Sequence, residues 1–262
     1  MDGKVIASKR KQAERNVQAH IDEILSSLAE DIADAANGVM VSSSLTVFSR
    51  TVRTKANSSI SKAKEDIDTY IVEYSKASIS IVGDKNTGAV GRLLRSNIFG
   101  RTFRDRSESY MEYFFNDVVK ILFAAKRMKM SDDDAKSTAI SEYKDPYVGG
   151  VISKASAAGE RIDTPSYGRG VYRSAYQNIV RNAQGTVAIA WSKEEYNYAR
   201  RNGAIGFIPH RGSTYPCELC DSHAERFHKM NDKNDPPPLY HSRCCCWVTY
   251  VFDEKDIMKN KE

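Results

Sequence analysis

Five cysteines lie close together near the C-terminus, in two groups whose spacing suits a metal ion. Cys217 and Cys220 form a Cys-x-x-Cys pair, and twenty residues later comes the run His241-Ser-Arg-Cys244-Cys-Cys. Two thiolates separated by two residues on a tight turn can bind one metal ion without backbone strain, and His-x-x-Cys can do the same from the other side. The two groups together offer the sulfur and nitrogen ligands of a tetrahedral site.

The predicted ion is a structural zinc, and its predicted ligands are Cys217, Cys220, His241 and Cys244. Four protein ligands leave no position for water, so such a site stabilises two short strands and performs no chemistry. Cys246 would lie on the same strand face as Cys244 and is the alternative fourth ligand, whereas Cys245 would point the other way as a small packed residue. Another metal, or free or disulfide-bonded cysteines, are the alternatives to zinc.

The stretch YPCELCDSHAERFH at 215–228 also contains both halves of the zinc-deaminase signature, Pro-Cys-x-x-Cys and His-x-Glu. In deaminases His-x-Glu comes first, and its Glu acts beside an open zinc position. Here the order is reversed, and the two residues between Cys220 and His223 leave no room for two helices facing each other across a pocket. We interpret the match as chance composition.

Other catalytic patterns are absent from the sequence, including a nucleophile elbow, a phosphate loop and a glycine fingerprint. His210, His223 and His228 fit surface or turn positions better than a metal shell. The expectation is therefore that the protein is not an enzyme and has no small-molecule substrate. A nuclease or toxin-like enzyme is the alternative, and it would place His223 or Glu225 in the active site.

Charge and hydropathy limit the functional classes to which the protein can belong. The 262 residues carry a net charge of +5, from 39 basic and 34 acidic side chains that are interspersed throughout. No apolar run reaches the roughly 18 residues of a membrane helix, and the N-terminus has no apolar signal core. We expect a soluble protein that stays in the cytoplasm where it is made. A nucleic-acid-binding zinc module is a further alternative, with Arg200, Arg201, Arg211 and Arg226 as its scattered candidate contacts.

Apolar residues that recur every three or four positions predict the helices that must position this site. They cover about 8–36, 56 to near 83, 103–125, 131–143 with Ser131 as N-cap, and 172 to Asn202-Gly203. The glycines of 83–91 predict a loop, and DPYVGG at 145–150 interrupts the chain. The runs AIGFIPH and CCCWVTYVF predict two strands, at 204–210 and 244–252.

The expected fold class is mainly α, a helical body with a small C-terminal zinc-bound α+β module. The expected boundaries are 1–163 for the body, 164–252 for the module and 253–262 for a charged tail. The apolar face of 103–125 needs a partner, and the first two helices are the available ones.

Read as one pattern, the last third consists of a helix, the strand NGAIGFIPHRGS, CELC, a polar turn, PPPLYHSRCCC and the strand WVTYV. This resembles the C-terminal module of the Mu F-like minor head proteins, the phage head morphogenesis family, over about residues 165–252. Cys217, Cys220, His241, Cys244 and Cys246 fall on the family's motif positions. The sequence departs from that pattern at Tyr240, an extra residue, and at Cys245, where the family usually has a polar residue.

The resemblance implies a structural virion component, made in the host cytoplasm and located in the capsid interior or at the portal vertex. Its implied partners are the portal protein, the major capsid protein or both, during head assembly. The mild positive charge makes packaged DNA an additional candidate partner. No membrane partner is expected.

Overall fold

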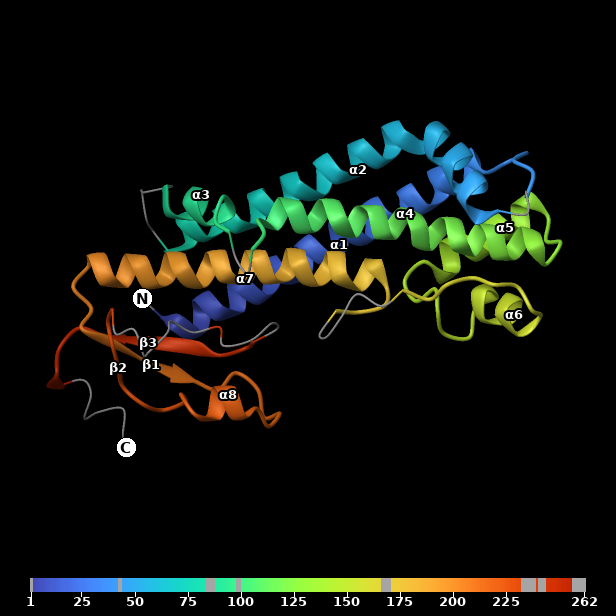
Figure 1. Ribbon diagram of the computed structural model, residues 1–262. Coiled ribbons are helices and arrows are strands. Elements are labelled where there is room, and N and C mark those ends of the chain that lie inside the picture. The colour runs from blue at the N-terminus through green and yellow to red at the C-terminus, as the bar shows by residue number, and fades with distance from the viewer. Residues whose placement is uncertain are drawn as a thin grey trace. The chain divides into compact units, whose positions relative to one another are not determined.

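The structure is a computed structural model that describes residues 2–41, 44–82, 88–97, 100–165, 171–231, 239 and 244–255. Most of this described chain is helical, and a small antiparallel sheet lies near its C-terminal end (Figure 1). The predicted fold class, mainly α with a small C-terminal α+β module, is confirmed.

The helices are α1 (Gly3–Ala35), α2 (Leu45–Val82), α3 (Gly88–Leu94), α4 (Phe103–Arg127), α5 (Asp132–Glu142), α6 (Val151–Ala157), α7 (Ala175–Arg201) and α8 (Glu218–Asp221). The strands are β1 (Gly206–His210), β2 (His228–Lys229) and β3 (Trp247–Val251). The central strand β1 pairs antiparallel with both of the others. None of the described helices combines the length and the apolar character that a membrane span requires.

The long periodic segments and the two predicted strands are confirmed as elements. α1 and α2 begin earlier than predicted, at Gly3 and Leu45, and their added turns contribute the buried Ile6 and Phe48 to the core. Ser131 caps α5 as predicted: its Oγ accepts a hydrogen bond from the Asp134 N–H at 3.1 Å. α7 ends where Gly203 adopts a left-handed φ of 85°, a conformation that glycine allows at no steric cost.

The predicted loop at 83–91 is wrong at its end, because α3 begins at Gly88. α3 buries Val90, Leu93 and Leu94, which lie at helical spacing, and this burial favours a helix in spite of the glycines. The short elements α6, α8 and β2 were not predicted. Each of them is shorter than two helical turns or a typical strand, so periodicity carries little signal for them.

Contacts divide the chain into two compact units. Unit 1 comprises residues 1–18, 70–102 and 183–262, and unit 2 comprises 19–69 and 103–182. Because α1, α2 and α7 each contribute to both units, the units are not consecutive in the sequence. The sequence-based division into a helical body at 1–163, a module at 164–252 and a charged tail at 253–262 stays a prediction. Residues 256–262 of the tail lie outside the described residues.

The core of unit 2 forms around α4. Phe114 and Phe115 of this helix are fully buried, and Phe123 packs its ring against Phe48 of α2 at a centroid distance of 5.7 Å. The guanidinium of Arg53, also on α2, lies 4.1 Å from the centre of the Phe115 ring. The partner that the apolar face of α4 requires therefore includes α2, as predicted.

A buried carboxylate holds the start of α7 in unit 2. Asp117 of α4 accepts hydrogen bonds from the Tyr147 hydroxyl at 2.5 Å and from the Ala175 N–H at 2.9 Å. Burial raises the pKa of Asp117 to about 6, although both hydrogen bonds favour its charged form. The first backbone N–H of α7 is thus satisfied by a side chain of another helix.

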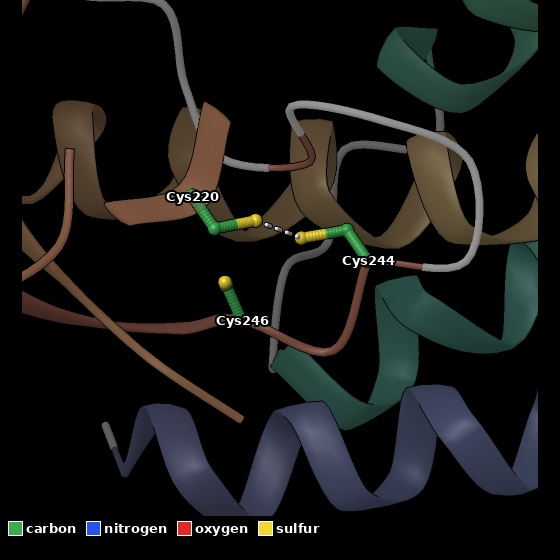
Figure 2. Close-up of side chains that lie close together, drawn as sticks. All are labelled: Cys220, Cys244 and Cys246. Carbon is green, nitrogen blue, oxygen red and sulfur yellow. Dashed lines mark hydrogen bonds between the residues drawn. The ribbon is translucent and has the colours of Figure 1, made fainter. Parts of the chain in front are cut away.

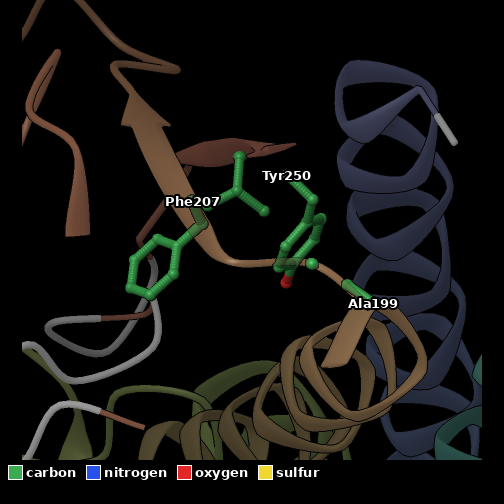
Figure 3. Packing of buried hydrophobic residues seen from close by; sticks show 5 residues of the cluster. Ala199, Phe207 and Tyr250 are labelled. Atoms are coloured by element: carbon green, nitrogen blue, oxygen red, sulfur yellow. The ribbon is translucent and has the colours of Figure 1, made fainter. Parts of the chain in front are cut away.

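In unit 1 the sheet packs against the C-terminal end of α7. The register pairs Phe207 of β1 with Tyr250 of β3, which places both rings on one face of the sheet. There they meet Ala199 of α7, together with Ala204 and Val248 (Figure 3). This apolar cluster gives the small sheet a core of its own beside the cysteines.

Candidate metal centre

Three cysteine thiols gather in the interior of unit 1. The Sγ atoms of Cys220, Cys244 and Cys246 all lie within 4.8 Å of one another, and those of Cys220 and Cys244 are 3.8 Å apart. Figure 2 shows the three sulfur atoms pointing toward a common centre. All three residues are buried, and none of them forms a disulfide bond. This cluster can hold a metal ion.

The first group of ligands is shaped by α8. Cys217 has an extended backbone just before the helix, with a φ of −151°, and its carbonyl accepts a hydrogen bond from the Asp221 N–H at 2.8 Å. This single turn brings the half-buried Cys217 against the cluster that contains Cys220. The Cys-x-x-Cys pair therefore faces the other thiols from one side, as its spacing predicts.

The extended segment that leads into β3 positions the second pair of cysteines, Cys244 and Cys246. Side chains alternate along an extended chain, so Cys244 and Cys246 point to the same side, toward Cys220. The alternative ligand Cys246 therefore joins Cys244 in the cluster and does not replace it. Cys245 lies between them and is exposed, so the prediction that it is a packed residue is wrong. The same alternation that turns its neighbours inward directs its side chain to the surface.

The remaining predicted ligand, His241, lies outside the described residues. Leu239, the described residue nearest to it in sequence before the cluster, packs against the thiols. Of the four predicted ligands, the structure thus brings Cys220 and Cys244 together and places Cys217 beside them.

Crowding and burial govern the protonation of the thiols. Burial raises the pKa of Cys220 to about 12, and the neighbouring thiol of Cys244, together with burial, raises the pKa of Cys246. Two thiolates close together repel each other, so the thiols keep their protons unless a cation compensates. A divalent ion bound here would displace these protons, and its affinity would rise with pH.

Arg211 holds the loop that carries the first cysteine pair. Its guanidinium donates to the Asp221 carboxylate at 2.6 Å, to the carbonyl of Cys217 at 3.3 Å, and to the carbonyls of Ser213 and Tyr215. Asp221 in turn accepts a hydrogen bond from the Cys217 N–H at 3.2 Å. This side chain, which the sequence offered as a nucleic-acid contact, is a scaffold of the loop.

His210 connects this loop to β3. Its Nδ1 lies 2.9 and 3.1 Å from the two carboxylate oxygens of Glu225, and its Nε2 lies 2.9 Å from the hydroxyl of Thr249. The Trp247 ring stacks on the imidazole at a centroid distance of 4.0 Å. Glu225 has a left-handed φ of 58°, and its N–H donates to the Pro209 carbonyl at 2.8 Å.

His228 differs from its sequence-based interpretation as a surface or turn residue. It is buried, at 5% exposure, on β2, and its ring stacks on Phe207 at 5.3 Å. Its Nε2 contacts the carbonyl of His223 at 3.1 Å. The pairing of β2 with β1, which the sequence did not reveal, is what moves this histidine into the core.

A buried charged group from α1 reaches the cysteine segment. Arg10 donates from Nη2 to the carbonyl of Cys246 at 2.9 Å, and its Nε lies 3.5 Å from Glu14. Glu195 of α7 is buried nearby, within the electrostatic influence of Arg10. No local pattern could have assigned this role to Arg10, since 236 residues separate it from Cys246.

Glu195 should make the stability of unit 1 depend on pH. Burial raises its pKa to about 8, and Arg10 only partly opposes this. The folded state therefore keeps the proton that the unfolded chain loses above about pH 4.5. Stability should fall as pH rises from about 4.5 to 8, by up to roughly 1.4 kcal/mol per pH unit, and level off above that.

Urea unfolding of the wild type and of Glu195→Gln over this pH range checks the expectation. The neutral variant should gain stability relative to the wild type as pH rises, because Gln has no proton to lose. If the difference in free energy of unfolding between the two proteins stayed constant with pH, Glu195 would not retain its proton in the folded state.

Comparison of the chain with protein-family models, with curated proteins and with solved structures found no match in any of the three.

Proposed function

We propose that this protein is a structural, non-enzymatic minor head protein of a phage, whose C-terminal module is stabilised by one structural zinc ion. The proposal of a zinc site rests on the convergence of the buried thiols of Cys220, Cys244 and Cys246. Thiolate-rich, four-coordinate shells are typical of structural zinc, and they leave no open position for a substrate.

Cys217 is the proposed fourth ligand. It already packs against the three buried thiols, and one turn of α8 is enough to turn its sulfur toward them. Four thiolates would give a closed site at the end of the sheet. His241, the ligand expected from spacing and from the family motif, is the alternative in the fourth position.

The role in head assembly is supported by the resemblance of 165–252 to the Mu F-like module, in which Cys217, Cys220, Cys244 and Cys246 fall on motif positions. The structural features agree with a docking role. Within the predicted module, 164–252, α7 packs against a small sheet, and hydrogen bonds of Arg211 hold the loop beside the cysteine cluster. We propose the portal protein, the major capsid protein or both as its partners, inside the virion.

Elemental analysis of freshly reduced protein tests the zinc site. We expect about one zinc per chain in the wild type and in His241→Ala, and a strong loss in Cys217→Ser. The opposite ranking of the two variants would assign the fourth position to His241. Absence of bound metal from the wild type would contradict the zinc centre.

Co-expression tests the assembly role. The chain should co-elute in size-exclusion chromatography with the portal or major capsid protein encoded in the same genome, and should be found by mass spectrometry in purified virions. A chain that is absent from virions and binds neither protein would contradict this role.

The alternative is a zinc module that binds nucleic acid. It has less support than the structural role, because arginines near the sheet already contact other groups of this chain. Arg211 donates to four groups of its own loop, and Arg201 lies 3.6 Å from the buried carboxylate of Glu194. Arg200 contacts Asn231 at 3.3 Å. A gel shift whose affinity falls steeply with salt would favour this alternative over the structural role.

A further inference from the structure

The metal centre proposed above is built from two chain segments that are far apart in sequence. Cys217 and Cys220 belong to residues 211–225, the segment that contains α8 and is called the α8 loop below. Cys244 and Cys246 belong to the segment before β3. A tetrahedral ion needs sulfur atoms at about 2.3 Å, so the two segments must be held at a fixed separation. Contacts made by other side chains determine whether the two segments are already held at this separation before an ion binds.

His210 makes such a contact. Its partner Glu225 follows Cys220 by five residues, and its partner Thr249 follows Cys246 by three. The two hydrogen bonds of one imidazole ring therefore join the end of the α8 loop to the strand that continues from the second pair of cysteines. Stacking on Trp247 fixes the plane of the ring between them.

We infer that His210 is a positioning residue of the metal centre: it sets the separation of the two cysteine pairs without being a ligand. Both ring nitrogens already have partners, at 2.9 Å from Glu225 and 2.9 Å from Thr249, so ligation would require breaking one of these contacts. This inference rests on the proposed zinc site.

A close backbone approach supports the same separation. An added Cβ at Gly212, two residues after His210, would overlap the backbone carbonyl of Cys245. The chain leaving β1 thus passes directly against the segment of the second cysteine pair. The two segments therefore approach each other closely at Gly212, near the point where His210 joins them by hydrogen bonds.

The energetic consequence is a preorganised site. When the His210 contacts are lost, the two cysteine pairs gain freedom, and the ordering of the α8 loop must then be offset by the metal-binding energy. Removal of groups outside the ligand shell typically lowers metal affinity about 10–100-fold. We expect a reduction in this range for His210→Ala and a smaller one for Thr249→Val, which removes one hydrogen bond and keeps a β-branched strand residue.

Zn²⁺ affinity, measured by competition with a chromophoric chelator, tests the inference on the full chain. Thr214→Val is the matched control, since Thr214 is exposed on the same loop and the substitution is chemically identical to Thr249→Val. Its affinity should equal that of the wild type. Circular dichroism before each titration establishes that the variants are folded, and Co²⁺ absorption reports the geometry of the thiolate shell.

The inference holds if His210→Ala and Thr249→Val weaken Zn²⁺ binding, with altered Co²⁺ bands, while Thr214→Val does neither. A residue that only stabilises the fold would lower the melting temperature and leave the affinity of the folded protein unchanged, and that result would overturn the inference. If His210→Ala does not fold, Thr249→Val alone decides. A wild type that binds no Zn²⁺ would instead contradict the proposed zinc site, and the positioning role with it.

Discussion

Cys220→Ser should abolish binding of the proposed zinc ion and unfold the small sheet with its cysteine loops, while the long helices stay folded. Cys220 is buried at 3% exposure among the other thiols, and a serine hydroxyl is a poor substitute for a thiolate on zinc. Structural zinc sites contribute apparent binding energies of roughly 10–16 kcal/mol, so the loss of one ligand should cost on the order of several kcal/mol. The described strands are two to five residues long, so the apolar cluster around Phe207 and Tyr250 is small and offsets only part of this loss.

Two signals distinguish unfolding of the sheet from unfolding of the long helices. Trp247 lies on β3, so its fluorescence in a Trp191→Phe background reports the sheet, whereas circular dichroism at 222 nm reports the helices. In Cys220→Ser the fluorescence transition should move to lower urea concentration, and most of the helical signal should remain. Equal loss of both signals would count against a sheet that is stabilised separately from the long helices.

Cys245→Ser is the matched control for this experiment. Cys245 is adjacent in sequence to two cysteines of the cluster, yet it is exposed and does not belong to it. Its substitution should leave the zinc content and both unfolding transitions unchanged. If Cys245→Ser lost the metal as Cys220→Ser does, the assignment of inward and outward cysteines would be wrong.

Phe114→Ala should destabilise unit 2 by several kcal/mol, on the order expected for truncation of a buried aromatic side chain. The Phe114 side chain is fully buried on α4 and packs edge-on against the Tyr143 ring at a centroid distance of 5.6 Å. Truncation of a buried Phe removes its transfer free energy and leaves a cavity, which typically costs about 3–5 kcal/mol. Urea unfolding followed by circular dichroism at 222 nm measures this cost.

Asn116→Ala, an exposed substitution two residues further along α4, should change the free energy of unfolding by less than about 0.5 kcal/mol. Zinc content should stay the same in both variants, because the thiols belong to the other unit. A cost below about 1 kcal/mol for Phe114→Ala would show that the site tolerates the loss of the ring, in conflict with a well-packed core around α4.

Local pattern determined the fold class. Apolar residues at helical spacing located the long helices, and the aromatic and β-branched runs located β1 and β3. The alternation of an extended chain indicated that Cys244 and Cys246 share a face. These features depend on residues within a few positions of one another, so the sequence can be read without knowledge of the rest of the fold.

Tertiary structure decided which groups meet around the cysteines. The contact between Arg10 and the Cys246 carbonyl depends on how α1 packs, and the burial of His228 depends on the pairing of β2 with β1. Arg211 became a scaffold because the chain folds back on its own carbonyls, and Cys245 became exposed because its neighbours turn inward. The spacing of residues along the chain does not encode these long-range contacts, because they form only when distant elements pack together.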